Sequence, residues 1–186
     1  GGIYKSMGLN PDLVIYGKAL GNGFAISAII GKKKIMDIAQ DTFVSSTAWT
    51  ERVGFAAGLG VIKFHNKNEV FKHNKNIGKQ IKNGWLKFAK KHDIKIKVNN
   101  LDTIVNFNFL YNSKNEYLIT LFTELMLKEN FLANNTIYLS YAHKKNIIKK
   151  YFKAIDNVFF KISKNLKKKE IKLKSKIRKT NYIRIS

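Results

Sequence analysis

Hydrophobic runs in the first third of the chain are short and are separated by loops rich in glycine and polar residues. DLVIY at residues 12–16 and FAISAIIG at residues 24–31 are apolar and partly β-branched, so they predict two short buried strands. The pattern predicts a helix over residues 32–40 and an extended piece over residues 42–47 that ends in hydroxyl side chains. Strands and helices in this order indicate an α/β segment.

From residue 50 onward the small and apolar positions follow the period of a helix. Thr47 or Thr50 is its candidate N-cap, because a threonine hydroxyl accepts a hydrogen bond from a free backbone N–H at a helix start. The helix is expected to bury one face, made of Val53, Ala56, Ala57, Gly60, Val61 and Phe64.

Three further helices are predicted over residues 68–92, 114–130 and 144–165, because apolar side chains recur there at spacings of three and four. Lysines and other polar residues stand between them, so each helix presents one face to a common core. The residues expected in that core are Ile77, Ile81, Trp85, Phe88, Ala89, Leu118, Leu121, Phe122, Leu125, Met126, Ile148, Tyr151, Phe152, Ile155, Val158, Phe159 and Ile162.

Strands are predicted between these helices. The runs at residues 94–98 and 103–109 alternate between apolar and polar residues, and the Asn-Asn pair between them favours a turn. Residues 131–133 and 137–140 are shorter strand candidates. Helices that flank antiparallel strands indicate a small α+β domain.

The change of pattern near residues 60–70 divides the chain into domains. Residues 1–65 are expected to form the α/β part and residues 66–165 the small α+β part. Residues 166–186 form a lysine-rich basic tail, which is expected to be solvated and only partly ordered, with a binding arm as the alternative.

The net charge of +23 raises the question of nucleic-acid binding. Only Arg52, Arg178 and Arg184 among the 35 basic residues are arginine, the residue that phosphate and guanine readers favour, so no nucleic-acid partner is expected. No apolar run approaches the ~18–20 residues of a membrane helix, and no membrane partner is expected either.

The absence of cysteine excludes disulfides, thiolate zinc sites and cysteine nucleophiles, and it fits a cytoplasmic protein. No metal site is expected, because the histidines lack the spacing of metal ligands. They are His65, His73, His92 and His143.

One lysine stands out in the stretch VIYGKALGNGFAISAIIG, where Lys18 lies between two apolar runs. Burial disfavours a charged amine and lowers its pKa, and a neutral amine can form a Schiff base with a carbonyl. Gly17, Gly21 and Gly23 fit such a site, because glycine allows the backbone to approach a bulky ligand. A solvated lysine in an ordinary loop is the alternative.

Two longer stretches carry a family resemblance. NPDLVIYGKALGNGFAISAIIGKKKIMD at residues 10–37 resembles the lysine motif of the class III aminotransferases, which use pyridoxal 5′-phosphate (PLP). FVSSTAWTERVGFAAGLGVIKF at residues 43–64 resembles the segment that follows this motif in the family. The branch that includes glutamate-1-semialdehyde aminomutase is the nearest. The resemblance implies the C-terminal part of a fold type I PLP-dependent transferase, with residues 1–65 from the end of the large α/β domain and residues 66–165 as the small α+β domain.

The resemblance also implies roles for particular residues. Lys18 matches the lysine that forms the Schiff base with PLP and that moves a proton between the substrate and the cofactor. Thr47 matches the hydroxyl that contacts the cofactor phosphate of the neighbouring subunit, and Ser46 is a further candidate for cofactor binding. A homodimer with shared active sites follows from this match.

Departures from the family pattern limit what is expected. Many members carry Gly-Asn-Pro after the threonine, whereas this chain has Ala48, Trp49 and Thr50, followed by Glu51 and Arg52. Glu51 and Arg52 either contact the substrate or the partner subunit or, as is expected first, form a surface ion pair. The family's acid at the pyridine nitrogen, its ring-stacking aromatic and its phosphate cup precede the lysine, and only 17 residues do so here. The chain is therefore expected to be roughly the C-terminal two-fifths of such an enzyme and to bind PLP poorly by itself.

The function expected first is that of a transaminase or aminomutase acting on a small-molecule amino donor and acceptor. The substrate is an amino acid, a semialdehyde or an amino sugar. Tyr138 and Tyr141 either face the active site or pack in a core or interface. The alternatives are a truncated, non-catalytic fragment of such an enzyme and, less expected, a basic nucleic-acid-binding module.

Overall fold

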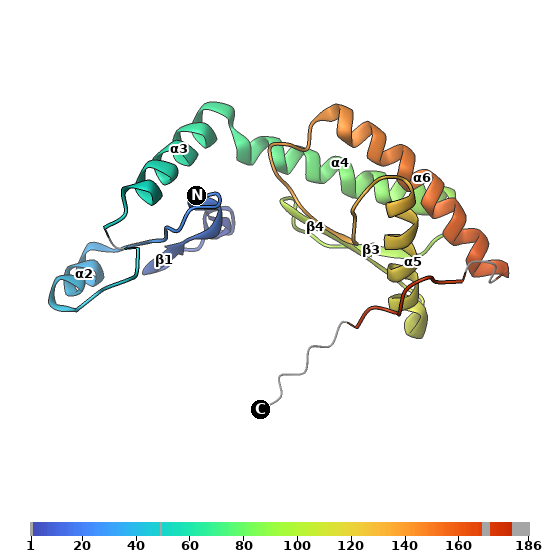
Figure 1. The fold of residues 1–186 in the computed structure, drawn as a ribbon, viewed down its shortest axis with the longest axis horizontal. Coiled ribbons are helices and arrows are strands. Elements are labelled where there is room, and N and C mark those ends of the chain that lie inside the picture. The colour runs from blue at the N-terminus through green and yellow to red at the C-terminus, as the bar shows by residue number, and fades with distance from the viewer. Residues whose placement is uncertain (1, 49, 169–171, 180–186) are drawn as a thin grey trace. The chain divides into compact units, whose positions relative to one another are not determined.

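The computed structural model describes residues 2–48, 50–168 and 172–179, and the chain divides into two compact units (Figure 1). Unit 1 is Gly1–Glu69 and unit 2 is Val70–Ser186. The domain boundary expected between residues 65 and 66 falls inside the helix that ends unit 1. That the two units correspond to the large and small domains of the family stays a prediction.

Unit 1 contains one hairpin-like pair of strands and a long helix. Strands β1 and β2 pair antiparallel, with Leu13 opposite Gly31 and Tyr16 opposite Ala28. Lys32 Nζ lies 2.7 Å from Asp12 Oδ1, so an ion pair joins the two strands at the end where Leu13 faces Gly31. The elements are α1 (Ile3–Ser6), β1 (Leu13–Tyr16), a 3-10 turn (Lys18–Leu20), β2 (Ala28–Gly31), α2 (Lys33–Met36), a 3-10 turn (Asp37–Asp41) and α3 (Arg52–Asn68).

Three of these elements differ from the sequence prediction. The strand expected over residues 24–31 begins only at Ala28, because β1 offers four residues for pairing and the preceding residues form a loop. The helix expected over residues 32–40 breaks after Met36 into a 3-10 turn. The expected extended piece over residues 42–47 joins no strand within the part of the chain that the structure describes.

Helix α3 begins and packs differently from the prediction. Its N-cap is Glu51, without a side-chain capping hydrogen bond, so neither Thr47 nor Thr50 caps it. Its buried residues are Gly54 and Gly58, whereas most of the predicted face is exposed. The glycines are buried because neighbouring backbone comes so close: a Cβ at Gly54 would lie 2.6 Å from the carbonyl oxygen of Ala25.

Unit 2 is a three-stranded antiparallel sheet packed against three helices (Figure 1). The strand order is β3-β4-β5, and β4 lies in the middle. Side chains of β4 alternate between buried and more exposed positions, so one face of the sheet meets the helices. The elements are α4 (Val70–Lys91), β3 (Ile96–Val98), β4 (Ile104–Phe109), a 3-10 turn (Asn112–Lys114), α5 (Asn115–Lys128), β5 (Thr136–Tyr138) and α6 (Lys145–Lys168).

Aromatic side chains form the centre of the unit 2 core. Phe107 of β4 contacts Trp85, Phe122 and Phe159 edge-on, with ring centroids 4.9 to 5.9 Å apart. These arrangements are favourable for aromatic quadrupoles. Trp85 Nε1 donates a hydrogen bond to Tyr151 Oη over 2.8 Å, and burial raises the pKa of Tyr151. The polar atoms of both large side chains are thus satisfied inside the core.

Two parts of unit 2 differ from the prediction. Residues 131–133 form no strand. Residues 172–179 of the expected solvated tail lie instead along α5, where Glu124 accepts hydrogen bonds from the backbone N–H groups of Lys174 and Ser175 and from Ser175 Oγ. Arg178 Nε lies 3.0 Å from Glu116 Oε2. The basic segment binds there because α5 offers it carboxylates.

The contact with this segment also affects the titration of the Glu124 carboxylate. Desolvation works to raise its pKa, but the hydrogen bonds from Ser175 and Lys174 outweigh that effect and hold the pKa of Glu124 below its usual value. The charged form is therefore the one that the contact stabilises.

In the ranges that the structure describes, no helix has the length and apolar character needed to cross a membrane.

The close packing of α4 in unit 2 can be tested at Gly78. A Cβ at this position would collide with the carbonyl group of Asp102, a backbone group that has little room to move. We expect Gly78→Ala to destabilise unit 2 by about 2 kcal/mol, despite the better helix propensity of alanine. The measurement is urea unfolding followed by Trp85 fluorescence, in the 186-residue chain with Trp49→Phe.

The matched control for Gly78→Ala is Asn83→Ala in the same helix. Asn83 is exposed, so its replacement changes helix propensity alone and raises stability by a few tenths of a kcal/mol. Equal midpoints for the two variants would contradict the close contact at Gly78.

Candidate functional site

Lys18 is separated from the end of β1 by one residue and has an unusual backbone conformation. Gly17 is extended, and Lys18 then turns to a φ of 47°, in the left-handed region. Leu20 N donates to the Gly17 carbonyl over 3.1 Å, and Asn22 N donates to the Lys18 carbonyl over 3.1 Å. This conformation costs a residue with a Cβ about 1 kcal/mol or more, and such strain gathers at functional sites.

The β1 strand that leads to Lys18 is fixed at the same end. Tyr16 Oη and Tyr4 Oη lie 3.2 Å apart and share a hydrogen bond, which ties β1 to α1. This hydrogen bond, with smaller contributions from desolvation and from the Tyr16 charge, raises the pKa of Tyr4.

The glycines after Lys18 serve the fold of the loop. A Cβ at Gly21 would collide with the Phe24 carbonyl and lie 2.8 Å from Ile26 Cγ2. Gly23 has a φ of 110°, which side chains rarely allow. The tight turn thus accounts for Gly21 and Gly23, without the need for space for a ligand that the sequence suggested.

Helix α3 supports the Lys18 turn from the other side. A Cβ at Gly58 would lie 3.8 Å from the Leu20 carbonyl oxygen and 3.5 Å from Ile26 Cδ1, which are ordinary packing distances. With Gly54 against Ala25, this contact sets the position of the loop that follows Lys18.

A pocket of about 1190 Å³ in unit 1 contains all three residues proposed from the sequence. Lys18 lines it from the turn after β1, and Ser46 and Thr47 line it from the segment before α3. Apolar side chains from β1, β2 and the α2 region make much of the remaining wall. They include Leu13, Ile26, Ile29, Ile35 and Ile38.

Lys18, Ser46 and Thr47 are all exposed within this chain. Only residues of unit 1 line the pocket, and they do not bury Lys18. The burial of this lysine that the sequence pattern suggested is therefore not found in unit 1. Among the described residues, no hydrogen bond or ion pair engages Lys18 Nζ. A primary amine and neighbouring hydroxyls thus face the same open space.

Glu51 also lines this pocket. Of the two roles expected for Glu51 and Arg52, the surface ion pair does not occur among the described residues. Glu51 is the N-cap of α3, and Arg52 is the first residue of that helix. The signal in the sequence for this pocket position was that Glu51 is polar and lies between the hydroxyl-rich segment 45–47 and the start of a helix.

The other candidate residues belong to unit 2. The Tyr141 ring packs 4.8 Å from the ring of His73, and Lys144 Nζ lies 3.0 Å from its centroid. Tyr138 is 72% exposed on β5. Over the described ranges, no three histidine, aspartate or glutamate residues gather as they would around a metal ion.

A model of one protein family, described as aminotransferase class-III, matches residues 3–159. The chain belongs to this family. The resemblance inferred from the Lys18 and Thr47 motifs is thereby confirmed.

Curated relatives in the class-III family include two kinds of enzyme by name. A 2′-deamino-2′-hydroxyneamine transaminase from Streptomyces kanamyceticus is 30% identical over 96 residues, which are 52% of this chain and 24% of the relative. A glutamate-1-semialdehyde 2,1-aminomutase from Methanocaldococcus jannaschii is 26% identical over 175 residues, 86% of this chain and 41% of the relative. The matched regions thus span only 24% and 41% of the length of these two relatives.

Solved structures agree in fold. The FumI protein of Sphingopyxis sp. MTA144, in its PLP internal aldimine form, superposes with a TM-score of 0.79 at 22% identity, over 89% of this chain and 40% of that one. An omega-transaminase from Sphaerobacter thermophilus gives a TM-score of 0.76 at 16% identity, over 88% of this chain and 41% of that one. The expected fold class, the C-terminal part of a fold type I transferase, is confirmed.

The left-handed backbone at Lys18 predicts an inverted order of stability for two substitutions. We expect Lys18→Gly to be more stable than Lys18→Ala by about 1 kcal/mol, because glycine has no Cβ to strain at a φ of 47°. Thermal unfolding of the intact protein without cofactor measures the difference.

Lys63 provides the opposite control, because it is exposed in the middle of α3. There the glycine variant is expected to be the less stable by about 1 kcal/mol. The same order at both positions would show that Lys18 is not held in the left-handed region.

Proposed function

We propose that this chain carries the cofactor lysine of a PLP-dependent transaminase or aminomutase. The observation that carries the proposal is that Lys18, at its strained φ, lines a pocket of about 1190 Å³ in unit 1, where no described residue pairs with its amine. Family membership and the names of the relatives support the reaction class. The protein would act in the cytoplasm on a small-molecule amino donor and acceptor, among amino acids, semialdehydes and amino sugars.

The residues of the pocket fit part of what the cofactor requires. Its volume of about 1190 Å³ is ample for a ligand of this size. An unpaired amine faces it, and hydroxyl donors of the kind that bind phosphate line it. When bound, PLP supplies an electron sink for bond breaking at the carbon that bears the amino group.

Lys18 has two tasks in this proposal. Its amine would hold the cofactor through a Schiff base, and the same amine would carry a proton to and from the substrate carbon. A residue that must reach two positions needs a fixed backbone, and the turn Lys18–Leu20, supported by α3, provides one. The left-handed φ sets the direction in which the side chain leaves β1.

Ser46 and Thr47 are proposed to bind the cofactor phosphate. Both are exposed and lie in an irregular segment, so their hydroxyls are available to donate hydrogen bonds. Thr47 is proposed to serve the site of the neighbouring subunit, which makes the active enzyme a homodimer. Lys18 and Thr47 line one pocket within this chain, but in the proposed dimer each of them would act in a different site.

A second candidate is a non-catalytic fragment of such an enzyme. The observation that favours it is the apolar surface of unit 1, where Phe43 is 95% exposed and Ile15 is 74% exposed. Surfaces of this kind make a protein prone to association unless another part covers them. Retention of the cofactor by the intact protein separates the two candidates.

Reductive trapping tests the role of Lys18. After incubation of the intact protein with PLP and borohydride, we expect mass spectrometry to find the phosphopyridoxyl group on the Lys18 peptide. Lys18→Arg should remove it and lower kcat by roughly 10⁴-fold or more. Lys63→Arg, at an exposed lysine of α3, should change neither. Label spread evenly over the lysines would contradict a dedicated cofactor lysine.

Mixed dimers test whether Thr47 serves the partner's site. In a dimer of one Lys18→Ala chain and one Thr47→Val chain, a shared arrangement leaves one site with both native residues. We therefore expect half a complement of PLP bound with native affinity. If Thr47 acted in its own chain's site, the remaining lysine-containing site would bind PLP about tenfold more weakly, for the loss of one hydrogen bond to a charged group.

A further inference from the structure

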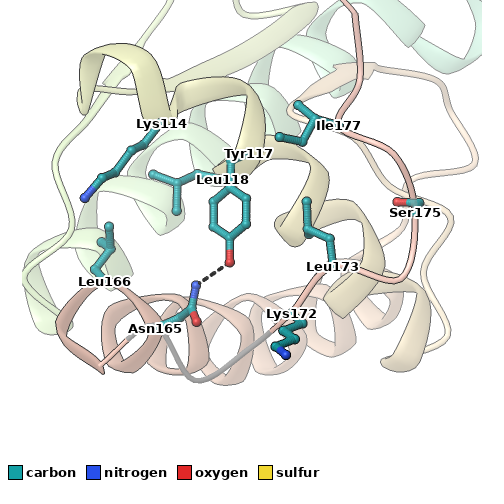
Figure 2. Close-up of a pocket in the computed structure, with 9 residues that line it drawn as sticks. All are labelled: Lys114, Tyr117, Leu118, Asn165, Leu166, Lys172, Leu173, Ser175 and Ile177. Carbon is teal, nitrogen blue, oxygen red and sulfur yellow. Dashed lines mark hydrogen bonds between the residues drawn. The ribbon is translucent and has the colours of Figure 1, made fainter.

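A second pocket, of about 560 Å³, lies wholly within unit 2 (Figure 2). Helices α5 and α6 form its walls, and the C-terminal segment 172–179 covers it. It shares no lining residue with the Lys18 pocket. Its apolar and uncharged side chains are those of Tyr117, Leu118, Asn165, Leu166, Leu173, Ser175 and Ile177.

The cover of this pocket is held in place by polar contacts to α5. Glu124 accepts the hydrogen bonds of Lys174 and Ser175, and the backbone N–H of Arg178 donates to Thr120 Oγ1 over 3.1 Å. Leu173 and Ile177 flank these anchors in sequence, and Figure 2 shows both beside Tyr117. The segment therefore brings two apolar side chains to the mouth of the pocket.

The interior is suited to a hydrocarbon or aromatic group. Leu118 is fully buried, and Asn165, only 4% exposed, donates a hydrogen bond from Nδ2 to Tyr117 Oη over 2.9 Å (Figure 2). The polar groups at the base are thus paired with each other, and the walls are mainly aliphatic. The volume lies in the range in which proteins bury small ligands.

Two lysines give the pocket its charge. Lys114 and Lys172 line it, and its lining contains no acid. No acidic group in the described ranges pairs with either ammonium. In Figure 2 the two lysines lie on opposite sides of the labelled group, with Leu118 and Tyr117 between them. An apolar pocket with unpaired cations at its edge is complementary to a ligand with an apolar body and an anionic end.

We propose that this pocket binds a small amphiphilic carboxylate. The hydrocarbon part fills the space among Leu118, Leu166 and Leu173, and the carboxylate pairs with Lys114 or Lys172 at the edge. This binding is separate from the proposed reaction at Lys18, and the two stand or fall independently.

Decanoate is the probe, and 1-decanol is its uncharged control. By titration calorimetry on the intact protein we expect decanoate to bind at one site and 1-decanol to bind more weakly. The double variant Lys114→Met and Lys172→Met should weaken decanoate binding about tenfold and leave 1-decanol binding unchanged. Lys167→Met, at an exposed lysine of α6 outside the pocket, should have no effect.

A second variant tests the location by filling the pocket. Leu173→Trp should abolish decanoate binding, whereas Leu132→Trp, at a position that is 95% exposed and outside the pocket, should not. Lys18→Ala should leave decanoate binding intact. The proposal is overturned if decanoate does not saturate the protein at millimolar concentrations. It is equally overturned if binding survives Leu173→Trp and the double lysine variant, or if Lys18→Ala abolishes it.

Discussion

In both units a helix packs so closely against a neighbouring loop that only glycine fits at the contact. Gly54 of α3 meets the Ala25 carbonyl, and Gly78 of α4 meets the Asp102 carbonyl. A side chain at either position would collide with that carbonyl group unless the helix or the loop moved away. In unit 1 the consequence reaches the candidate site, because Ala25 belongs to the loop that follows Lys18 and α3 also supports the turn Lys18–Leu20.

The candidate site combines a rigid backbone with exposed side chains. The turn at Lys18 is fixed by hydrogen bonds on both sides, by the tight loop at Gly21 and by α3, whereas the amine itself is exposed. This combination suits a residue that must form and release a covalent bond, because the backbone sets its direction and the side chain stays free to move. In the proposed enzyme the cofactor and the partner subunit would supply the surroundings that unit 1 alone does not.

Acidic residues, although few, organise the end of this basic chain. The chain has 12 acidic against 35 basic residues, and two of the acids on α5, Glu116 and Glu124, bind the C-terminal segment 172–179. Net charge therefore says little about where a lysine-rich segment lies. Its place depends on which carboxylates face it, and here that placement also creates the cover of the second pocket.

The sequence by itself determined the helices α4, α5 and α6, the strands β3 and β4 and the Lys18 motif, because these depend on periodicities and residue types that neighbouring positions express locally. Only the tertiary structure decided the length of β2, the buried face of α3 and the docking of residues 172–179. Each of these depends on a partner distant in sequence: the four residues of β1, the Ala25 carbonyl and the Glu124 carboxylate. The φ of Lys18 belongs to the same class, because the surrounding packing, rather than the preference of a lysine, imposes it.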